Sequence, residues 1–187
     1  MRERDRTTRC VQTADERVEC ACEIRQVVFR TDDPAFFLGE LRLIAEAFKT
    51  AIVSFDANKM AGGAHVQSAI IHALRSCASG TSIANSFEME ALLYAAGTRQ
   101  CALAAGFGVH AGENRAYLVF CPPSPAAAEA MGRLVTFVNE DWESISEEKE
   151  DLLIDIFSIT PQELLVTGRD RLKDLVLERV ALLEVMK

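Results

Sequence analysis

The chain has 187 residues, 49% of them hydrophobic, which suits one domain able to bury most of its apolar surface. No apolar run approaches the roughly 18 residues of a membrane-spanning helix, and the charged start MRERDRTTRC lacks the apolar stretch of a secretory signal. We therefore expect a cytoplasmic protein. The net charge of −8 argues against a general nucleic-acid binder, because neutralising the phosphate backbone needs Lys and Arg. A nucleic-acid contact would have to be local.

The first elements are predicted close to the N-terminus. Residues 1–16 are polar and without periodicity, so we predict a disordered extension ahead of one domain over residues 17–187. From Val18 to Ile24 the residues alternate with a period of two, which is typical of a β-strand. Asp33 and Pro34 then predict a helix start, with Asp at the N-cap and Pro at the first helical position.

Strands and helices follow one another in the middle of the chain. Residues 51–56, AIVSFD, predict a short buried strand. Apolar side chains within residues 66–77 recur at i, i+3, i+4, i+7, i+8 and i+11, which predicts a helix with one apolar stripe and Arg75 opposite it. A further helix is predicted over residues 87–96, and Thr98 can cap a short helix after it.

The last third is mainly helical. Residues 116–120, AYLVF, predict a third strand, which the prolines of CPPSP end. Helical segments are predicted near residues 125–139, 146–157, 161–167 and 170–186. Three strands and about eight helical segments that do not strictly alternate indicate an α+β domain, in which helices cover a small, mostly antiparallel central sheet. A regular α/β layer with a parallel sheet is the alternative.

The cysteines and histidines match no catalytic or metal-binding motif. The six cysteines include no CxxC pair, so we expect reduced, mostly buried thiols and no metal site. His65 and His72 share one side of a helix but lie about 10.5 Å apart along its axis, too far to bind one metal ion. We interpret both as hydrogen-bonded residues at the edge of the apolar stripe. His110 lies in a loop that contains glycines.

Motifs for nucleotide binding and nucleophilic catalysis are missing from the sequence. Neither GxxxxGK[ST] nor GxGxxG is present, nor are GxSxG and HExxH. We therefore expect no cofactor and assign no catalytic residue. The alternative is a stand-alone enzyme on a small molecule, using His and Cys residues that the fold brings together.

Five polar residues occur in or beside the turns of the middle region: Lys59, Arg75, Asn85, Arg99 and Gln100. Asn85 suits an N-cap or a turn, and Arg99 with Gln100 suits a solvated helix start. The functional alternative is a small positive pocket for a phosphate or an unpaired nucleotide end. Spacing alone favours the structural interpretation.

The C-terminal helix carries more apolar surface than one stripe. One broad arc, centred on Leu172, Val176 and Leu183, is predicted to seal the protein's own core. An adjoining face is then left for a partner, which helix-to-groove or helix-to-helix docking would suit. The candidate residues of that face are Leu177, Val180, Ala181 and Glu184.

Three blocks of the sequence carry a resemblance to a known family. They are SFDANKMAGGAHVQSAIIHALRS, SIANSFEMEALLYAAGTRQCALAAGFGV and DLVLERVALLEVMK. In this order they resemble the archaeal form of the small kinase-binding regulatory subunit of the KEOPS complex. The likeness runs from about Val18 to Lys187, and LLYAAGTRQ followed by FGV, with the terminal LERVALLEV, is its most specific part.

The resemblance implies an α+β fold without catalysis of its own. KEOPS transfers a threonylcarbamoyl group to the adenosine next to the anticodon of certain tRNAs, and a separate metalloprotein is its catalytic subunit. Members of the family bind a small atypical kinase with ATPase activity and help to recruit tRNA through its single-stranded 3′ CCA end. The kinase is thus the implied partner of the C-terminal helix. The five polar residues become the implied tRNA contact, since an unpaired end needs few contacts.

Overall fold

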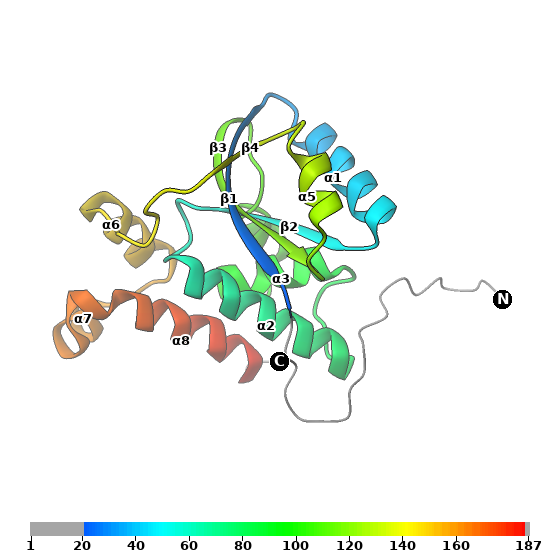
Figure 1. Ribbon diagram of the computed structural model, residues 1–187. Coiled ribbons are helices and arrows are strands. Elements are labelled where there is room, and N and C mark those ends of the chain that lie inside the picture. Colours follow the sequence, from blue (N-terminus) through cyan, green and yellow to red (C-terminus); the bar gives the residue numbers. More distant parts are fainter. Residues whose placement is uncertain (1–20, 186–187) are drawn as a thin grey trace.

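The computed structural model describes residues 21–185, in which four antiparallel strands form one sheet (Figure 1). With the bounds below, the strand order is β2-β3-β1-β4. The elements in chain order are β1 (Glu23–Thr31), α1 (Pro34–Phe48), β2 (Ala51–Asp56), α2 (Gly63–Ser79), α3 (Phe87–Ala96), α4 (Cys101–Ala105), β3 (Gly112–Cys121), α5 (Pro125–Met131), β4 (Thr136–Val138), α6 (Glu147–Ile156), α7 (Pro161–Thr167), a 3₁₀ turn (Arg169–Arg171) and α8 (Leu172–Val185).

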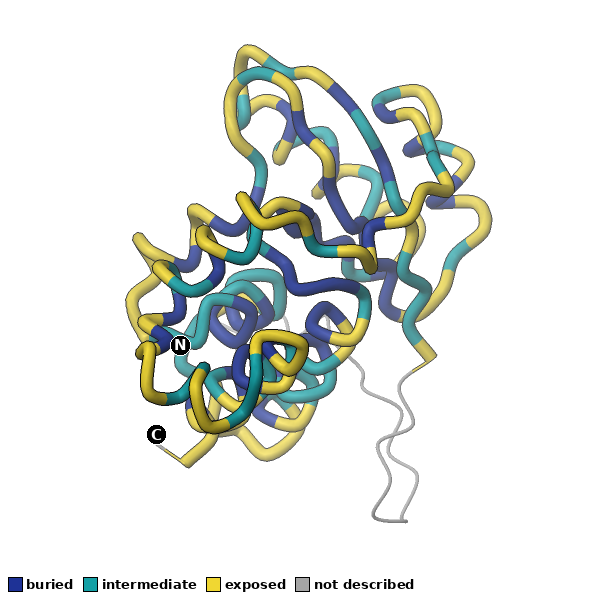
Figure 2. Tube along the Cα trace, turned by 90° about the vertical axis from the view of Figure 1, so that its left-hand side faces the viewer, coloured by how far each residue is buried: buried dark blue, intermediate teal, exposed yellow. Residues whose placement is uncertain are grey.

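The central strand β3 divides the interior into two cores. Its side chains alternate between the faces of the sheet, as strand geometry requires. Leu118 and Phe120 pack in the core under α1 and α5, whereas Tyr117 and Val119 pack in the larger core that α2, α3 and α8 cover. Figure 1 shows α1 and α5 together on one side of the sheet and α2, α3 and α8 on the other. Buried segments run through the middle of the molecule in Figure 2.

The predicted fold class is confirmed, and several elements begin and end where the sequence places them. α1 starts at Pro34, and the Asp33 carboxylate accepts a hydrogen bond of 3.0 Å from the backbone N–H of Phe36. β2, α3 and α7 have the predicted bounds. Arg75 is exposed on the outer side of α2, opposite buried Val66 and Ile70.

Three predictions about elements are wrong. The first strand runs from Glu23 to Thr31 instead of from Val18 to Ile24; Val18 and Cys20 are outside the described residues. The single helix predicted over residues 125–139 is α5 followed by a turn and the short strand β4, because residues 136–138, Thr-Phe-Val, favour a strand. Thr98 does not cap α4: its Oγ1 accepts from the backbone N–H of Gln100, which is the N-cap residue.

The expectation of reduced cysteines is wrong for one pair. Cys22 and Cys121 form a disulfide between residues 99 positions apart. Antiparallel pairing of β1 with β3 brings Glu23 opposite Phe120, so the residues just beyond this pair meet at the end of the ladder. Cys77 and Cys101 are thiols. Cys10 and the predicted disorder of residues 1–16 lie outside the described part of the chain.

Candidate functional site

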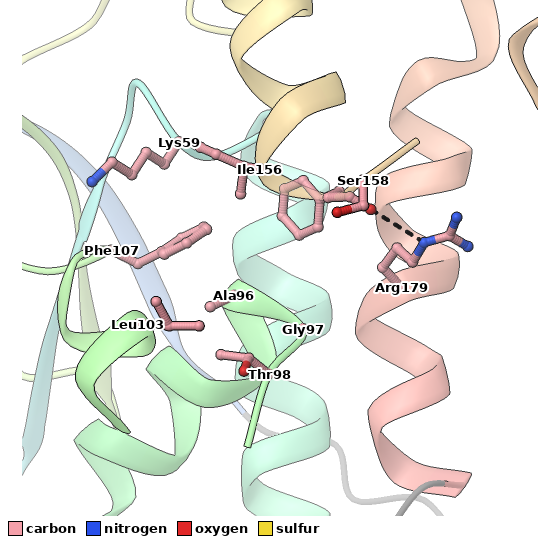
Figure 3. A pocket seen from close by; sticks show the side chains of 10 residues that line it. Lys59, Ala96, Gly97, Thr98, Leu103, Phe107, Ile156, Ser158 and Arg179 are labelled. Atoms are coloured by element: carbon pink, nitrogen blue, oxygen red, sulfur yellow. Dashed lines mark hydrogen bonds between the residues drawn. The ribbon is translucent and has the colours of Figure 1, made fainter. Parts of the chain in front are cut away.

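A pocket of about 470 Å³ lies where the end of α3, the start of α4, the end of α6 and the middle of α8 meet (Figure 3). Its lining consists of Lys59, Ala96, Gly97, Thr98, Leu103, Phe107, Ile156, Phe157, Ser158 and Arg179. Figure 3 shows Lys59 and Arg179 on opposite sides of the pocket, with Leu103, Ala96 and Thr98 between them. The pocket therefore has an apolar floor and a cation at each of two rims.

Arg179 is held in place at one rim by α7 and by the end of α6. Its Nε donates to the carbonyl of Phe157 at 3.4 Å, and its Nη2 pairs with the carboxylate of Glu163. Hydrogen bonds from the Thr160 backbone, from Arg179 and from the Thr160 hydroxyl hold the pKa of Glu163 at about 2, below its usual range. Glu163 therefore stays charged near neutral pH and keeps the guanidinium at the rim.

Lys59 is held at the opposite rim by groups from two parts of the chain, the end of β2 and the turn after α4. Its Nζ donates to the carbonyl of Gly106 at 2.5 Å and lies 3.9 Å from Oδ2 of buried Asp56. The ammonium group also lies 5.9 Å from the ring centroid of Phe107, within cation–π range. Gly106 and Asp56 thus fix the position of the ammonium group at this rim.

The two aromatic residues that line the pocket are almost fully buried, since Phe107 and Phe157 are each 5% exposed. Phe107 and Phe157 meet edge to face, with centroids 6.1 Å apart. Gly97 ends α3 in the left-handed conformation at φ 58°, and a Cβ there would lie 3.5 Å from the backbone oxygen of Arg179. Glycine is therefore favoured here by its positive φ, whereas the distance to α8 would leave room for a Cβ in ordinary van der Waals contact.

The five predicted RNA-binding residues do not form one cluster, because α2 and α3 are antiparallel. Nε2 of His65, in the first turn of α2, donates to the carbonyl of Ala95 at the end of α3, at 2.9 Å. Ser76, near the end of α2, donates to Glu90 at the start of α3, at 2.7 Å. The first residue of α2, Gly63, and Arg75 near its other end are therefore separated by about 18 Å along the axis.

Three of the five residues lie at the pocket end of this helix pair. Lys59 lines the pocket, and exposed Arg99 and Gln100 directly follow its lining residue Thr98. Arg75 and Asn85 lie at the far end and are both exposed. The interpretation of Asn85 as an N-cap is wrong, because Ser86 caps α3 by accepting from Met89 at 3.2 Å.

The loop that carries Asn85 is organised by a buried carboxylate. Glu90 is 0% exposed, and its Oε2 accepts from the backbone N–H groups of Ile83 and Ala84 at 2.9 and 2.8 Å. With Ser76 on Oε1, the carboxylate has three hydrogen bonds. This contact links the end of α2, the loop and the start of α3.

The buried arc of α8 is where the sequence predicts it. One residue predicted to contact a partner, Val180, is part of this buried arc. Leu172, Val176 and Leu183 are buried. Val180 is 0% exposed as well, so the prediction that it faces a partner is wrong. The reason is its direction: it lies about 40° from Val176 around the helix, at the edge of the buried arc.

The other three predicted partner residues are accessible. Leu177 is half-buried, whereas Ala181 and Glu184 are exposed. The carboxylate of Glu184 accepts a hydrogen bond of 2.5 Å from the hydroxyl of Tyr94, and it lies 3.5 Å from Nδ1 of His72. Glu184 therefore fastens the end of α8 to α3 and α2.

The three histidines have different surroundings. His65 is a core residue rather than one at the edge of the stripe: Nδ1 accepts from the Ala61 backbone at 3.1 Å, and burial lowers its pKa to about 4. His72 stacks on the ring of Tyr94 at 5.3 Å. Nδ1 of His110 donates a hydrogen bond to the carbonyl of Ala111 at 3.0 Å, and Nε2 of His110 lies 4.0 Å from Oδ2 of Asp56.

Several residues that shape the site cannot be singled out from the sequence. Phe107 and Phe157 come from segments 50 residues apart and look like ordinary core residues until the fold brings them together. Arg179 does give a signal, since a charged residue interrupts an apolar arc. Leu165 and Val166 on α7 are each 86% exposed, and no periodicity distinguishes them from buried residues.

Within residues 21–185 no group of three or more His, Cys, Asp or Glu side chains could hold a metal ion. In the same part of the chain, no helix combines the length and apolarity needed to cross a membrane. No protein-family model matches the chain, and no curated protein matches it in sequence.

Proposed function

We propose that this chain is a non-catalytic subunit of a cytoplasmic KEOPS-type complex. In this proposal it binds the small atypical kinase and helps to recruit tRNA through the 3′ CCA end for threonylcarbamoyladenosine formation next to the anticodon. Two observations support this proposal. The three sequence blocks resemble the family in composition and order. The pocket between α3, α4, α6 and α8 has the size and chemistry that an unpaired nucleotide end needs.

The pocket is the observation that carries the tRNA part of the proposal. A terminal base would lie on the apolar floor against exposed Leu103, while its phosphates would contact Lys59 and exposed Arg99 at the rim. Only a few cations are involved, so an acidic chain can bind a nucleotide end without a broad basic surface. Arg75 and Asn85, at the far end of α2, would contact a different part of the tRNA or none.

The kinase part of the proposal rests on the outer side of the C-terminal helices. Leu177 and Ala181 stay accessible on α8, and Val185 at its end is 80% exposed. The two neighbouring apolar residues of α7, Leu165 and Val166, are also on the surface. Exposed aliphatic side chains on helices suit docking against a groove or another helix.

A binding experiment with two arginine variants tests the tRNA part. Arg99→Glu and Arg75→Glu change the net charge equally, and both arginines are exposed. Arg99→Glu should weaken tRNA binding about tenfold, whereas Arg75→Glu should have a much smaller effect. The measurement is a fluorescence titration with intact tRNA and with tRNA lacking its CCA nucleotides.

Trimming the CCA nucleotides should weaken binding about as much as Arg99→Glu, and added salt should reduce the affinity for intact tRNA. Equal binding of trimmed and intact tRNA would show that the pocket does not take the 3′ end. A matching loss in both arginine variants would show that general charge, rather than the pocket, determines binding.

The alternative, a stand-alone small-molecule enzyme, is favoured by one observation. Nε2 of His110 faces the buried carboxylate of Asp56 at 4.0 Å, and the backbone of His110 is clamped by Asn114 through bonds of 3.1 and 2.8 Å. A held imidazole beside a carboxylate can act as a general base. Under that alternative, His110→Ala would abolish turnover of the substrate and leave kinase and tRNA binding unchanged.

A further inference from the structure

A disulfide joins β1 and β3 at one end of their ladder. Cys22 directly precedes β1, and Cys121 is the last residue of β3. The bond encloses everything from β1 to β3, including α1, α2, α3 and α4. It therefore closes a loop of about 100 residues. This loop supplies most of the buried residues of the two cores.

The rest of the fold does not depend on this bond. β1 and β3 pair over nine residue positions from Glu23 to Thr31, and β3 also pairs with β2 over six. Both hydrophobic cores extend well beyond the cysteines. A reduced protein should thus stay folded, with the change confined to the terminal Glu23–Phe120 pair and its surroundings.

The two sulfur atoms differ in their accessibility. Cys121 is 8% exposed and belongs to the larger core, whereas Cys22 is only partly buried against it. A thiol from solution therefore reaches Cys22 first. Access is the condition that separates an exchangeable disulfide from an inert one.

We propose that the Cys22–Cys121 disulfide is a redox-responsive anchor for the N-terminal end of β1, and that its reductant is a dithiol. A thiolate of the dithiol attacks Sγ of Cys22, the bond between the two cysteines breaks, and Cys121 leaves as a thiolate that takes up a proton. The second thiol of the reductant then attacks the mixed disulfide and releases Cys22. Two electrons pass to the protein, and the reductant ends as a disulfide.

Reduction has a local and a global effect. Locally, the first residues of β1 lose their covalent attachment to β3, so the backbone amides of Ile24 and Arg25 should exchange faster with solvent. Globally, a loop of about 100 residues is no longer closed in the unfolded chain, which gains conformational entropy. The melting temperature should fall by roughly 10 °C.

The full chain is purified without reductant, and the disulfide is located by mass mapping of non-reduced peptides. Melting is followed by circular dichroism before and after dithiothreitol, and again after reoxidation with oxidised glutathione. The wild-type melting temperature should fall on reduction and recover on reoxidation. Cys121→Ser should melt like the reduced protein and no longer respond to dithiothreitol. Cys101→Ser, which removes an exposed thiol, should behave like the wild type.

Three outcomes overturn the proposal. A map without a Cys22–Cys121 peptide would remove the bond itself. Identical melting with and without dithiothreitol would mean that the bond anchors nothing. Complete unfolding on reduction, in both the wild type and Cys121→Ser, would make the bond an obligatory structural cross-link rather than a reversible anchor. Faster exchange at Ile24 and Arg25, with β2 amides unchanged, is the supporting result.

Discussion

His65 and Glu90 are polar side chains that the fold buries between α2 and α3. Each has its polar atoms satisfied: His65 by the Ala61 and Ala95 backbones, and Glu90 by Ser76 and two loop amides. Burial without such partners would cost several kcal/mol. The two residues thus fix α3, whose last residue Ala96 lines the pocket, against α2.

The sequence could not assign these roles. A histidine or glutamate at the edge of an apolar stripe is usually half-exposed, and only the antiparallel packing of α3 against α2 buries both. The neighbouring carboxylate of the same helix turn has a different environment: Glu90 is buried, and Glu88 is half-buried at the first turn of α3.

Replacing Glu90 should destabilise the protein far more than replacing its neighbour. Glu90→Ala leaves the hydroxyl of Ser76 and the amides of Ile83 and Ala84 without an acceptor, which should cost about 3 kcal/mol of unfolding free energy. Glu88→Ala, the matched control, should cost less than about 1 kcal/mol. Urea unfolding measures both. Equal losses would show that the loop does not depend on the buried carboxylate.

The stability of the protein should fall as the pH drops from about 7 to about 5, because of His65. Burial, followed by the positive charge of Lys149, lowers the pKa of His65 to about 4, from 6.5 in the unfolded chain. A histidine whose folded pKa is depressed stabilises the protein above the unfolded pKa, and this contribution is lost as the pH falls toward the folded pKa. By pH 5 the loss is about 2 kcal/mol.

His65→Asn separates this effect from the other titrating groups. Asn can still accept from the Ala61 backbone but cannot take up a proton, so the variant should be less stable at pH 7 and show a shallower decline toward pH 5. Urea unfolding at several pH values gives the slopes. Parallel slopes for the wild type and the variant would mean that His65 is not the titrating group.

At the scale of the element, α8 separates into a buried arc and an accessible face. Its sequence predicts the arc around Val176 correctly, because a 3.6-residue period places Leu172, Val176 and Leu183 together. It does not predict the width of the arc, which depends on how deeply α2 and α3 enclose the helix. Val180 was therefore assigned to the wrong side.

The same substitution should lower the stability of the protein at one position of α8 and leave it nearly unchanged at the next position. Val180→Glu places a charge in the core and should unfold the protein or lower its stability by more than about 3 kcal/mol. Ala181→Glu, one residue further on, points to solvent and should melt within a few degrees of the wild type. Leu183→Glu should behave like Val180→Glu. Circular dichroism melting decides, and a well-folded Val180→Glu would contradict the buried arc.

At the scale of the whole molecule, hydrophobic periodicity gives the fold class and most of the helices. It misses β4, since a strand of three residues is too short for a period of two to appear. Periodicity also does not show that the five polar residues separate into three at one end of α2 and two at the other. Spacing along the chain does not tell which end of α2 lies near the pocket. Lys59, Arg99 and Gln100 lie at the same end of the helix pair only because α3 runs antiparallel to α2.

The arrangement of the molecule keeps the two proposed binding functions apart. The pocket opens between α3, α4 and the middle of α8, while Ala181 and Val185 belong to the last turns of α8 and point to solvent. A kinase docked on that face would leave Lys59 and Arg99 available to tRNA. Binding of one partner should therefore not abolish binding of the other.

The most direct measurement of the central claim is size-exclusion chromatography with light scattering on this chain mixed with the small atypical kinase of KEOPS. We predict a one-to-one complex for the wild type. Leu177→Glu and Ala181→Glu, which should keep the fold, are predicted to elute apart from the kinase, because each puts a charge against a desolvated partner surface. Separate elution of the wild-type chain and the kinase would contradict the proposed function.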